Sequence, residues 1–464
     1  MSLLRFTNIY SEQTTRSLLW NKVLEYLTPE MIYNNNHIPF IAQLKKKNST
    51  FFANSLRPSE ILIYESPDSD SPEHYSFTDN CKISSKGITL ESQSGEISEF
   101  ATKDVKLWSS YLSNISSDIP LSPQLICYSF NSVPIEQPIC EPFVESYEQM
   151  LLTHDLNFSI PLFDCILESE NSKSLTDKLF KLYLRHGQRL RLFKEFAYYE
   201  IIYFASTPNE IYRQNNAFTQ TIITFFKSEL TEFINNAINP VKEEIVRHPL
   251  FDFDHPKEED LPQIEELLNY FWVKTNESLQ YIPLVIRRFL KYLRILCETH
   301  FGDINLNHKA VIGLFFLRFI VPSFNAPEAW IVNGQIDQTS FRKSVAFSKV
   351  ILSVSTLETN YTKVGDRQIL TPIIERNIPK MVHFLERITF VNDSEEMSGE
   401  TENVNLPFDE VVEAIQEFRA FIKECSDKLL QKVKKNGFVA PLFVFEAVNA
   451  LYQNDLYTKS RSYD

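Results

Sequence analysis

Residues 313–330 read Gly-Leu-Phe-Phe-Leu-Arg-Phe-Ile-Val-Pro-Ser-Phe-Asn-Ala-Pro-Glu-Ala-Trp, and this stretch decides the fold. From Val311 to Val321 nearly every residue is apolar, yet the run is too short to cross a bilayer. Because it is apolar on all sides rather than striped, it predicts a helix buried inside a larger helical domain. We expect Pro322 to end that helix, since a proline cannot keep the hydrogen bond to the preceding turn.

Arg318 is the one residue that does not suit a buried apolar helix. Its guanidinium is always charged, and a buried charge is tolerated only when it is paired and hydrogen-bonded. The sequence therefore predicts a guanidinium deep in the core with a fixed position. On composition alone the favoured interpretation is structural, an arginine that ties down loop carbonyls, because most buried charges far from a site have such a role.

Length and composition limit the classes of protein to consider. A chain of 464 residues predicts two to four domains. With 9 glycines and 37 phenylalanines, packed helices are favoured over a glycine-rich nucleotide-binding loop. The net charge of −14 argues against nucleic acid as the main partner. No stretch has the form of a signal peptide or a membrane-spanning helix.

Cysteine and histidine usage indicates a reducing compartment. The six cysteines are scattered without a Cys-x-x-Cys pair, and the nine histidines lack the spacing of zinc ligands. This pattern is typical of reduced thiols in a cytosolic protein. We therefore expect a cytoplasmic protein without a structural metal.

The N-terminal third changes its hydrophobic period. Residues 1–37 contain an amphipathic segment that predicts a short helix. Residues 38–116 instead carry short runs with the period of β-strands. The first candidate strands are Phe40–Leu44, Thr50–Ala53 and Ile61–Tyr64.

A capped helix over Thr102–Leu112 follows these strands and carries Trp108 on its apolar face. Several strands closed by such a helix resemble a pleckstrin homology (PH) domain, in which the tryptophan plugs one end of a seven-stranded sandwich. Lys45, Lys46 and Lys47 fall where these domains bind phosphoinositides, so the resemblance implies recruitment to the anionic inner face of the plasma membrane. The family's further basic residue on the second strand is missing. A solvated lysine loop is therefore the competing interpretation.

The rest of the chain divides by composition. Residues 117–147 form a proline-punctuated connection that is apolar enough to pack on a neighbour. The pattern is helical throughout 148–390, and 391–407 form an acidic linker or loop. Residues 408–464 predict two helices, either a hairpin packed on the preceding domain or a dimerising coiled coil of only three heptads.

Arg213 lies where turn residues lead into an amphipathic helix. It therefore projects from a loop at the mouth of a helix. A lone arginine in such a place usually points into solvent without a function.

Four motifs resemble those of Ras GTPase-activating proteins (RasGAPs). Phe316–Ser323 is similar to the family's Phe-Leu-Arg-x-x-x-Pro-Ala signature, with a serine in place of the usual alanine. Ile211–Thr219 is similar to the Leu-Phe-Arg-x-Asn-Ser-Leu-Ala-Thr finger loop. Trp272–Ser278 and Ile373–Leu385 match further segments of the family in the right order.

The resemblance implies a mainly α protein, an all-helical RasGAP domain preceded by a small β-rich PH-like domain (a β-sandwich plus a C-terminal helix). It implies stimulation of GTP hydrolysis by a GTP-bound Ras-family GTPase, which would switch off Ras signalling. Arg213 would be the inserted arginine finger, and Arg318 would hold the finger loop by its carbonyls. No cofactor is expected, because GTP and Mg²⁺ belong to the partner. The further partner-binding residues implied are Asn215, Thr219, Leu317 and Lys349.

One departure leaves a second class open. The family usually carries Ala-Lys-x-x-Gln-x-x-x-Asn after the buried signature. Ser348–Thr356 keep the lysine, but Leu352 and Thr356 replace the glutamine and the asparagine. The alternative is therefore a catalytically weak or inactive scaffold that keeps the RasGAP fold and binds a Ras-family GTPase.

Overall fold

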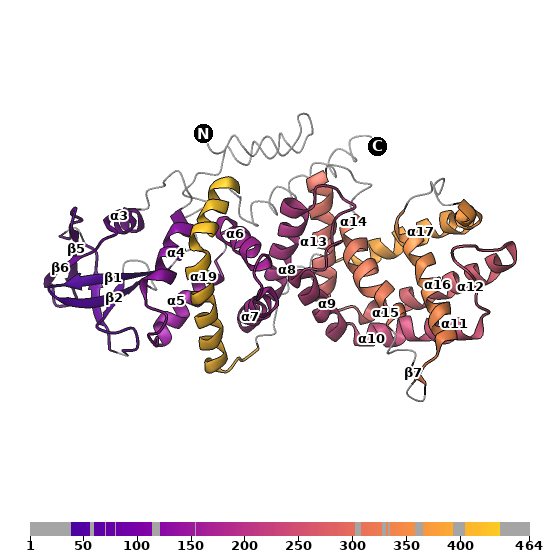
Figure 1. The fold of residues 1–464 in the computed structure, drawn as a ribbon, viewed down its shortest axis with the longest axis horizontal. Coiled ribbons are helices and arrows are strands. Elements are labelled where there is room, and N and C mark those ends of the chain that lie inside the picture. The colour runs from indigo at the N-terminus through magenta and orange to yellow at the C-terminus, as the bar shows by residue number, and fades with distance from the viewer. Residues whose placement is uncertain are drawn as a thin grey trace. The chain divides into compact units, whose positions relative to one another are not determined.

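The chain folds into two compact units, each described here by itself (Figure 1). Unit 1 comprises residues 1–189 and 402–464, and unit 2 comprises residues 190–401. The amphipathic segment predicted within residues 1–37 and the second predicted C-terminal helix lie outside the described residues. The computed structural model describes residues 39–55, 60–69, 71–78, 80–113, 121–153, 155–301, 308–326, 331–332, 335–357, 365–392 and 404–436.

Unit 1 begins with six described strands that form a closed antiparallel barrel in the order β1-β2-β3-β4-β5-β6. The first three strands fall on the predicted runs, because alternating side chains there face the barrel core. The described residues thus give a six-stranded barrel rather than the expected seven-stranded sandwich, and the PH-like assignment stays a prediction. The strands are β1 (Phe40–Lys46), β2 (Ser49–Ser55), β3 (Ile61–Tyr64), β4 (Glu73–Ser76), β5 (Gly87–Ser92) and β6 (Ile97–Ala101).

Helix α3 (Val105–Ser113) follows the barrel, as predicted. Trp108 is fully buried, and its ring meets the ring of Phe40 edge-on at 5.0 Å. Phe40 begins β1, so the tryptophan packs near the end of the barrel where this strand starts. Lys45 and Lys46 lie at the other end of the same strand, and Lys47 follows in the turn with a φ of 56°.

The expected connection over residues 117–147 contains helix α4 and the start of α5, because its prolines suit helix starts. Pro142 stands in the first turn of α5, where the missing N–H has no partner to lose. Helix α4 packs on the barrel, and the N–H of Ile41 donates to Ser129 Oγ at 3.0 Å. The helices are α4 (Leu121–Ser132), α5 (Glu141–Leu151), α6 (Leu156–Leu167) and α7 (Ser172–Arg185).

Helix α19 (Phe408–Asn436) returns to unit 1 and packs against α4, α5, α6 and α7. Its centre is Arg419, which is 0% exposed. The Arg419 guanidinium donates to the carbonyls of Val133 and Pro134 at 3.1 and 2.9 Å and lies 5.3 Å from the ring of Tyr147. The apolar stripe of this helix is therefore buried within unit 1, and the predicted C-terminal hairpin stays a prediction. The buried apolar residues are Val411, Ala414, Ile415, Phe418, Ile422, Cys425, Leu429 and Val433.

In the described residues of unit 2, the regular structure is helical apart from a short hairpin, β7 (Ile331–Val332) with β8 (Gln335–Ile336). Two of its π-helices, η2 and η7, contribute residues to the site described below. Its helices are α8 (Arg189–Tyr198), η2 (Tyr199–Phe204), α9 (Ala217–Glu229), α10 (Thr231–Phe233), η3 (Ile234–Ile238), α11 (Asn239–Arg247), η4 (Glu258–Asp260), α12 (Leu261–Glu277), η5 (Leu279–Tyr281), α13 (Leu284–Phe301), α14 (Lys309–Val311), η7 (Ile312–Ile320), α15 (Val321–Asn325), α16 (Gln338–Ser355), η9 (Gly365–Leu370) and α17 (Thr371–Ile388).

The apolar stretch that decides the fold forms η7, and most of its side chains are buried as predicted. The prediction that Pro322 ends this helix is wrong, because η7 passes directly into α15 with the proline in its first turn. The N–H of Val321 still donates five residues back, to Phe316 O, so the proline falls where the hydrogen-bond pattern changes. A proline at the start of an α-helical turn has no N–H bond to lose.

Two motifs quoted from the sequence meet in the core of unit 2. The indole N–H of Trp272 on α12 donates to Asn377 Oδ1 on α17 at 3.0 Å, and both side chains are buried. Arg376 adds two bonds of 3.0 Å to the Glu265 carboxylate. These bonds join α12 to α17.

Candidate functional site

The candidate site centres on the loop between η2 and α9, which carries Arg213. The Arg213 side chain is exposed, and its Nε donates to the carbonyl of Asn209 at 2.9 Å. Tyr212, the preceding residue, has a φ of 55°, in the left-handed region that side chains other than glycine seldom adopt. Such strain persists only where surrounding contacts hold the backbone in place.

Arg318 supplies two of these contacts. Its Nε donates to the carbonyl of Tyr212 at 2.7 Å, and its Nη2 donates to the carbonyl of Arg213. The sequence placed this guanidinium deep in the core, but it is half-buried, because it must reach from η7 to a surface loop. Burial lowers the pKa of Arg318, and the nearby Glu200 carboxylate opposes that shift.

Glu200 holds the same loop from η2 and was not singled out by the sequence analysis. Its Oε1 accepts from the N–H of Tyr212 at 2.7 Å, and the residue is only 3% exposed. Burial raises the pKa of Glu200, while the bond from Tyr212 and the charge of Arg318 lower it. The sequence does contain a signal for Glu200, because it is the one charged residue within the aromatic and aliphatic run 198–204, just as Arg318 is the one charged residue of its apolar run.

Gly313 lets the loop approach η7. A Cβ at this position would lie 2.8 Å from the carbonyl oxygen of Ile211 and 3.6 Å from Cβ of Tyr212. Backbone cannot yield as the end of a flexible side chain does, so this close approach requires a glycine. The loop therefore lies against η7, with the N–H of Tyr212 held by Glu200 and two of its carbonyls held by Arg318.

The far end of the loop is closed by a helix cap. Asn216 Oδ1 accepts from the N–H and the hydroxyl of Thr219 at 2.9 and 3.1 Å, which makes Asn216 the N-cap of α9. Thr219 is buried, whereas Asn215 is exposed and its carbonyl accepts from Gln220 at 3.3 Å. Asn216 was missed by the sequence analysis, although an asparagine before an amphipathic run is an N-cap signal.

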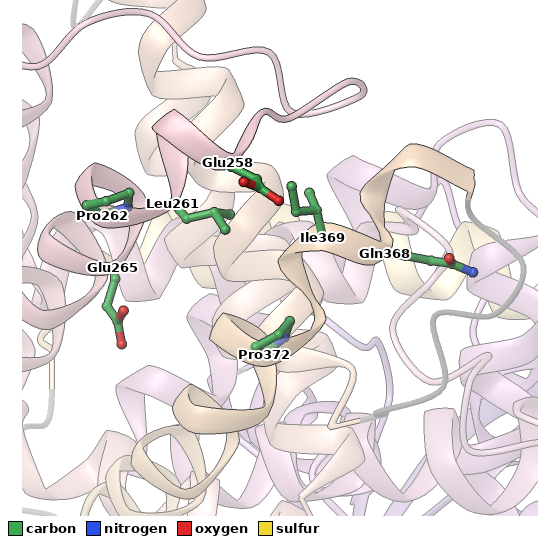
Figure 2. A pocket seen from close by; sticks show the side chains of 7 residues that line it. All are labelled: Glu258, Leu261, Pro262, Glu265, Gln368, Ile369 and Pro372. Atoms are coloured by element: carbon green, nitrogen blue, oxygen red, sulfur yellow. The ribbon is translucent and has the colours of Figure 1, made fainter.

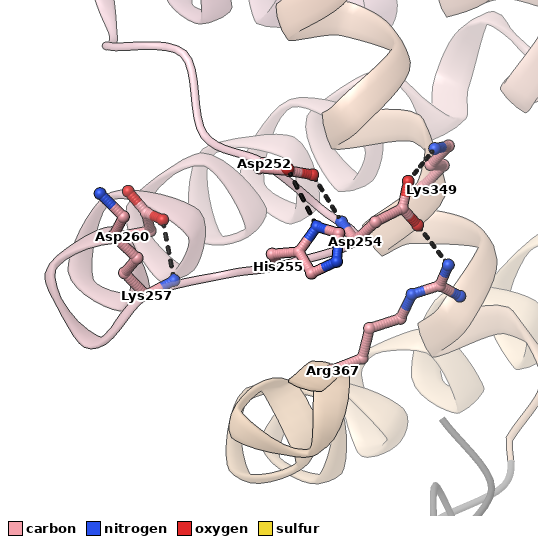
Figure 3. Close-up of polar contacts among 7 residues, drawn as sticks. All are labelled: Asp252, Asp254, His255, Lys257, Asp260, Lys349 and Arg367. Carbon is pink, nitrogen blue, oxygen red and sulfur yellow. Dashed lines mark hydrogen bonds and ion pairs between the residues drawn. The ribbon is translucent and has the colours of Figure 1, made fainter. Parts of the chain in front are cut away.

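Lys349 belongs to a second cluster, on α16. Its ammonium donates to Asp254 Oδ2 at 3.1 Å, and the guanidinium of Arg367 pairs with the other oxygen of the same carboxylate (Figure 3). Lys349 and Arg367 lie 5.6 and 4.8 Å from the ring centre of Phe253. The structure thus brings Arg213 and Arg318 together, whereas Lys349 pairs with a carboxylate that the sequence analysis did not identify. Leu317, beside Arg318 on η7, is half-buried.

Among the hollows in the described part of unit 2, two are bordered by α12 or α16. One of about 780 Å³ is bordered by the segment 249–263 and by α16, with Lys349 and Phe253 in its lining. The other, of about 580 Å³, lies between the start of α12 and the segment from η9 to α17 (Figure 2). Its lining residues are Glu258, Leu261, Pro262, Glu265, Gln368, Ile369 and Pro372.

The two positions that depart from the family pattern lie at the end of α16. Leu352 is half-buried, and Thr356 forms the C-cap, where its hydroxyl donates to Ser353 O at 2.8 Å. The carbonyl of Thr356 accepts from Lys309 Nζ at 2.9 Å. Thr356 therefore ends a helix, and neither side chain carries the amide that the family pattern has there.

No described helix is long and apolar enough to cross a membrane. Among the same residues, no group of three or more His, Cys, Asp or Glu side chains is placed to hold a metal ion. The expected absence of a metal stays a prediction.

Comparison with known families gives one match. Residues 252–356 match the RasGAP family, described as GTPase-activator protein for Ras-like GTPase. This stretch includes Arg318, Lys349 and Asp254, whereas Arg213 precedes it. A search of curated proteins found no match. The helical second unit therefore contains a stretch, residues 252–356, that is similar to RasGAP domains, and such a domain implies a Ras-family GTPase as partner.

Proposed function

We propose that the protein stimulates GTP hydrolysis by a GTP-bound Ras-family GTPase and thereby switches off Ras signalling, with Arg213 as the inserted finger. One observation carries the proposal. Arg318 donates to the carbonyls of both Tyr212 and Arg213, so a buried-helix arginine fixes the backbone of the loop that presents an exposed arginine.

The chemistry explains why these residue types are needed. A small GTPase hydrolyses GTP slowly, because the charge that develops on the phosphoryl oxygens is poorly compensated. An arginine brought in by a partner supplies positive charge and planar hydrogen-bond donors in a site from which water is excluded. For Ras itself, such an arginine accelerates hydrolysis by about 1,000- to 100,000-fold. GTP and Mg²⁺ would come with the partner.

Position matters as much as charge. A misplacement of about 1 Å can cost about 100-fold in rate. The loop is held at the Tyr212 N–H by Glu200, at two carbonyls by Arg318, and from below by Gly313. In the free chain, Arg213 donates to the carbonyl of Asn209, a neutral acceptor that phosphate oxygens would replace.

The test is single-turnover GTP hydrolysis with a panel of Ras-family GTPases. Arg213→Ala should remove most of the acceleration and leave binding nearly unchanged, because the finger acts in the transition state. Arg213→Lys should rescue little, since an ammonium lacks the planar fork. Thermal melting should not change, because an exposed loop residue makes few stabilising contacts.

Arg318→Ala is the informative companion variant. It removes both carbonyl bonds, so it should lower the acceleration and the melting temperature together. If Arg213→Ala kept the full acceleration of the wild type, the finger assignment would be wrong.

The second candidate is a scaffold that binds a Ras-family GTPase without accelerating it. It is favoured by Leu352 and Thr356, which lack the two amides of the family pattern. Binding of GTP-loaded partners without any acceleration by the wild type would establish this reading. Leu352→Gln and Thr356→Asn would then be the first changes expected to restore activity.

We further propose that the protein acts at the plasma membrane. A cytoplasmic protein recruited to the inner face of the plasma membrane would meet membrane-bound GTPases there. The exposed side chains of Lys45 and Lys47 support contact with a phosphoinositide or anionic lipid, whereas Lys46 donates to Ser98 Oγ at 3.0 Å.

A further inference from the structure

Asp254 bridges two cations that come from distant parts of unit 2. Lys349 lies on α16 and Arg367 on η9, and each donates to a different oxygen of the same carboxylate. All three side chains are partly open to solvent: Lys349 is 44% exposed, Asp254 42% and Arg367 34%. One accessible carboxylate therefore occupies an accessible two-cation site (Figure 3).

The two cations are held at this place by more than Asp254. Both lie over the ring of Phe253, at 5.6 Å for the ammonium and 4.8 Å for the guanidinium, and Phe253 is 5% exposed. Contacts of this kind attract a cation to the ring face independently of its counter-ion. The pair would keep its position if the carboxylate were exchanged for another.

The charge pattern around the pair is that of an acidic segment lying on a basic helix. Residues 252–260 carry five carboxylates and one lysine. Helix α16 carries Arg342, Lys343 and Lys349 and no acidic residue. The hollow of about 780 Å³ bordered by both shows that this segment does not fill the space beside the helix. Room remains for a second acidic surface next to Lys349.

We propose that Lys349 and Arg367 form a docking site for an acidic side chain of the GTPase, and that Asp254 is a built-in competitor which the partner's carboxylate displaces. This inference rests on the proposed Ras-family partner and adds Arg367 as a contact residue and Asp254 as a determinant of affinity. Charge complementarity favours this occupant, because one carboxylate can pair with both cations in the geometry that Asp254 already displays.

The competition weakens binding without touching the finger. The bond from Lys349 is the main cause that lowers the pKa of Asp254, so the competing carboxylate stays ionised at neutral pH. A partner carboxylate must replace one partly exposed ion pair with another, which leaves little net gain. Removing Asp254 would leave both cations free to pair with the partner alone.

The experiment measures binding of wild type and variants to a panel of Ras-family GTPases loaded with a non-hydrolysable GTP analogue, and single-turnover hydrolysis at saturation with the natural nucleotide. Asp254→Asn should lower the Kd by about two- to fivefold, the worth of one partly exposed ion pair, and this gain should shrink at high salt.

Two further variants make the result specific. Glu265→Gln removes a carboxylate of similar exposure, 35%, which is paired with Arg376 by two bonds of 3.0 Å, and it should leave the Kd unchanged. Arg367→Ala should raise the Kd and cancel most of the gain from Asp254→Asn. A purely structural role for Asp254 predicts weaker binding in Asp254→Asn, which is the opposite sign.

The outcomes separate this inference from the proposed function. A wild type that accelerates hydrolysis, together with an unchanged or higher Kd for Asp254→Asn, overturns the competitor role and leaves the finger proposal standing. A wild type that binds without acceleration, together with tighter binding by Asp254→Asn, supports the docking site and overturns the catalytic role. If neither the wild type nor Asp254→Asn binds any GTPase of the panel, the docking site is overturned.

Discussion

Gly313→Ala gives the sharpest test of how the Arg213 loop lies on η7, because sequence and structure predict different results. Glycine is the poorest ordinary residue in a helix, so an alanine there should stabilise the protein by about 1 kcal/mol on propensity alone. The structure places the new Cβ 2.8 Å from the carbonyl oxygen of Ile211, where ordinary contact begins at 3.4 Å. Either η7 or the finger loop must therefore move by about 0.6 Å.

The loop is the element expected to move. Gly313 lies on a helix whose neighbours Leu314, Phe315 and Phe316 are all 0% exposed, so the helix is fixed by a packed core. Overpacking of such a core costs about 1–3 kcal/mol, which roughly offsets the gain in helix propensity. The net change in melting temperature should therefore be small.

The displaced loop should cost much more in rate than in stability. A shift of a few tenths of an ångström to about 1 Å at Arg213 should lower the single-turnover rate by about 10- to 100-fold. Binding of the GTP-loaded partner should change little, because the finger acts in the transition state.

The assay compares hydrolysis, partner binding and thermal melting for wild type, Gly313→Ala and a control. Ser323→Ala is the matched control, because Ser323 follows on the same run of helix and its hydroxyl bonds only to Phe319 O at 2.7 Å among the described contacts. The control should keep full activity. A Gly313→Ala variant that melts higher and accelerates hydrolysis like the wild type would refute the close-approach argument.

Three further predictions concern other parts of the chain. Burial raises the pKa of Glu200 above 4.5, so the carboxyl group holds its proton more tightly in the folded state than in the unfolded state. The free energy of unfolding should therefore fall as the pH rises from 4.5 through the raised pKa. Glu200→Gln should lack this fall in thermal melts from about pH 4 to 7, and a pH profile identical to that of the wild type would contradict the prediction. Arg419→Ala removes the bonds to the carbonyls of Val133 and Pro134 and leaves a gap beneath α19, so chemical denaturation should give a loss of about 2–4 kcal/mol. An unchanged midpoint would show that this contact is dispensable. Replacing Lys45 and Lys47 by Gln should weaken binding to anionic liposomes by about 1 kcal/mol per lysine, most at low salt, whereas Lys46→Gln should have less effect. Liposome binding that changes neither with these substitutions nor with salt would contradict the lipid proposal.

The sequence by itself determined the classes of structure along the chain. Alternating apolar residues predicted the first three strands, and the helix predicted to carry Trp108 coincides with α3. The apolar run around Arg318 identified a buried helix, because burial on all sides leaves no polar stripe. Family resemblance paired Arg318 with the loop of Arg213, and the described bonds join them. These features depend on local periodicity or on short motifs that a single segment contains.

The tertiary structure alone added Glu200 and Gly313 to the residues that hold the site. Glu200 and Gly313 act on the finger loop from two different π-helices, and a regular 3.6-residue period does not predict where a π-helix points its side chains. Pro322 likewise continued a helix that the local rule would end. Asp254 meets Arg367 across a separation of 113 residues. Such contacts arise only when distant segments pack, because the energy of an ion pair or a close backbone approach depends on distance in space and not on distance along the chain.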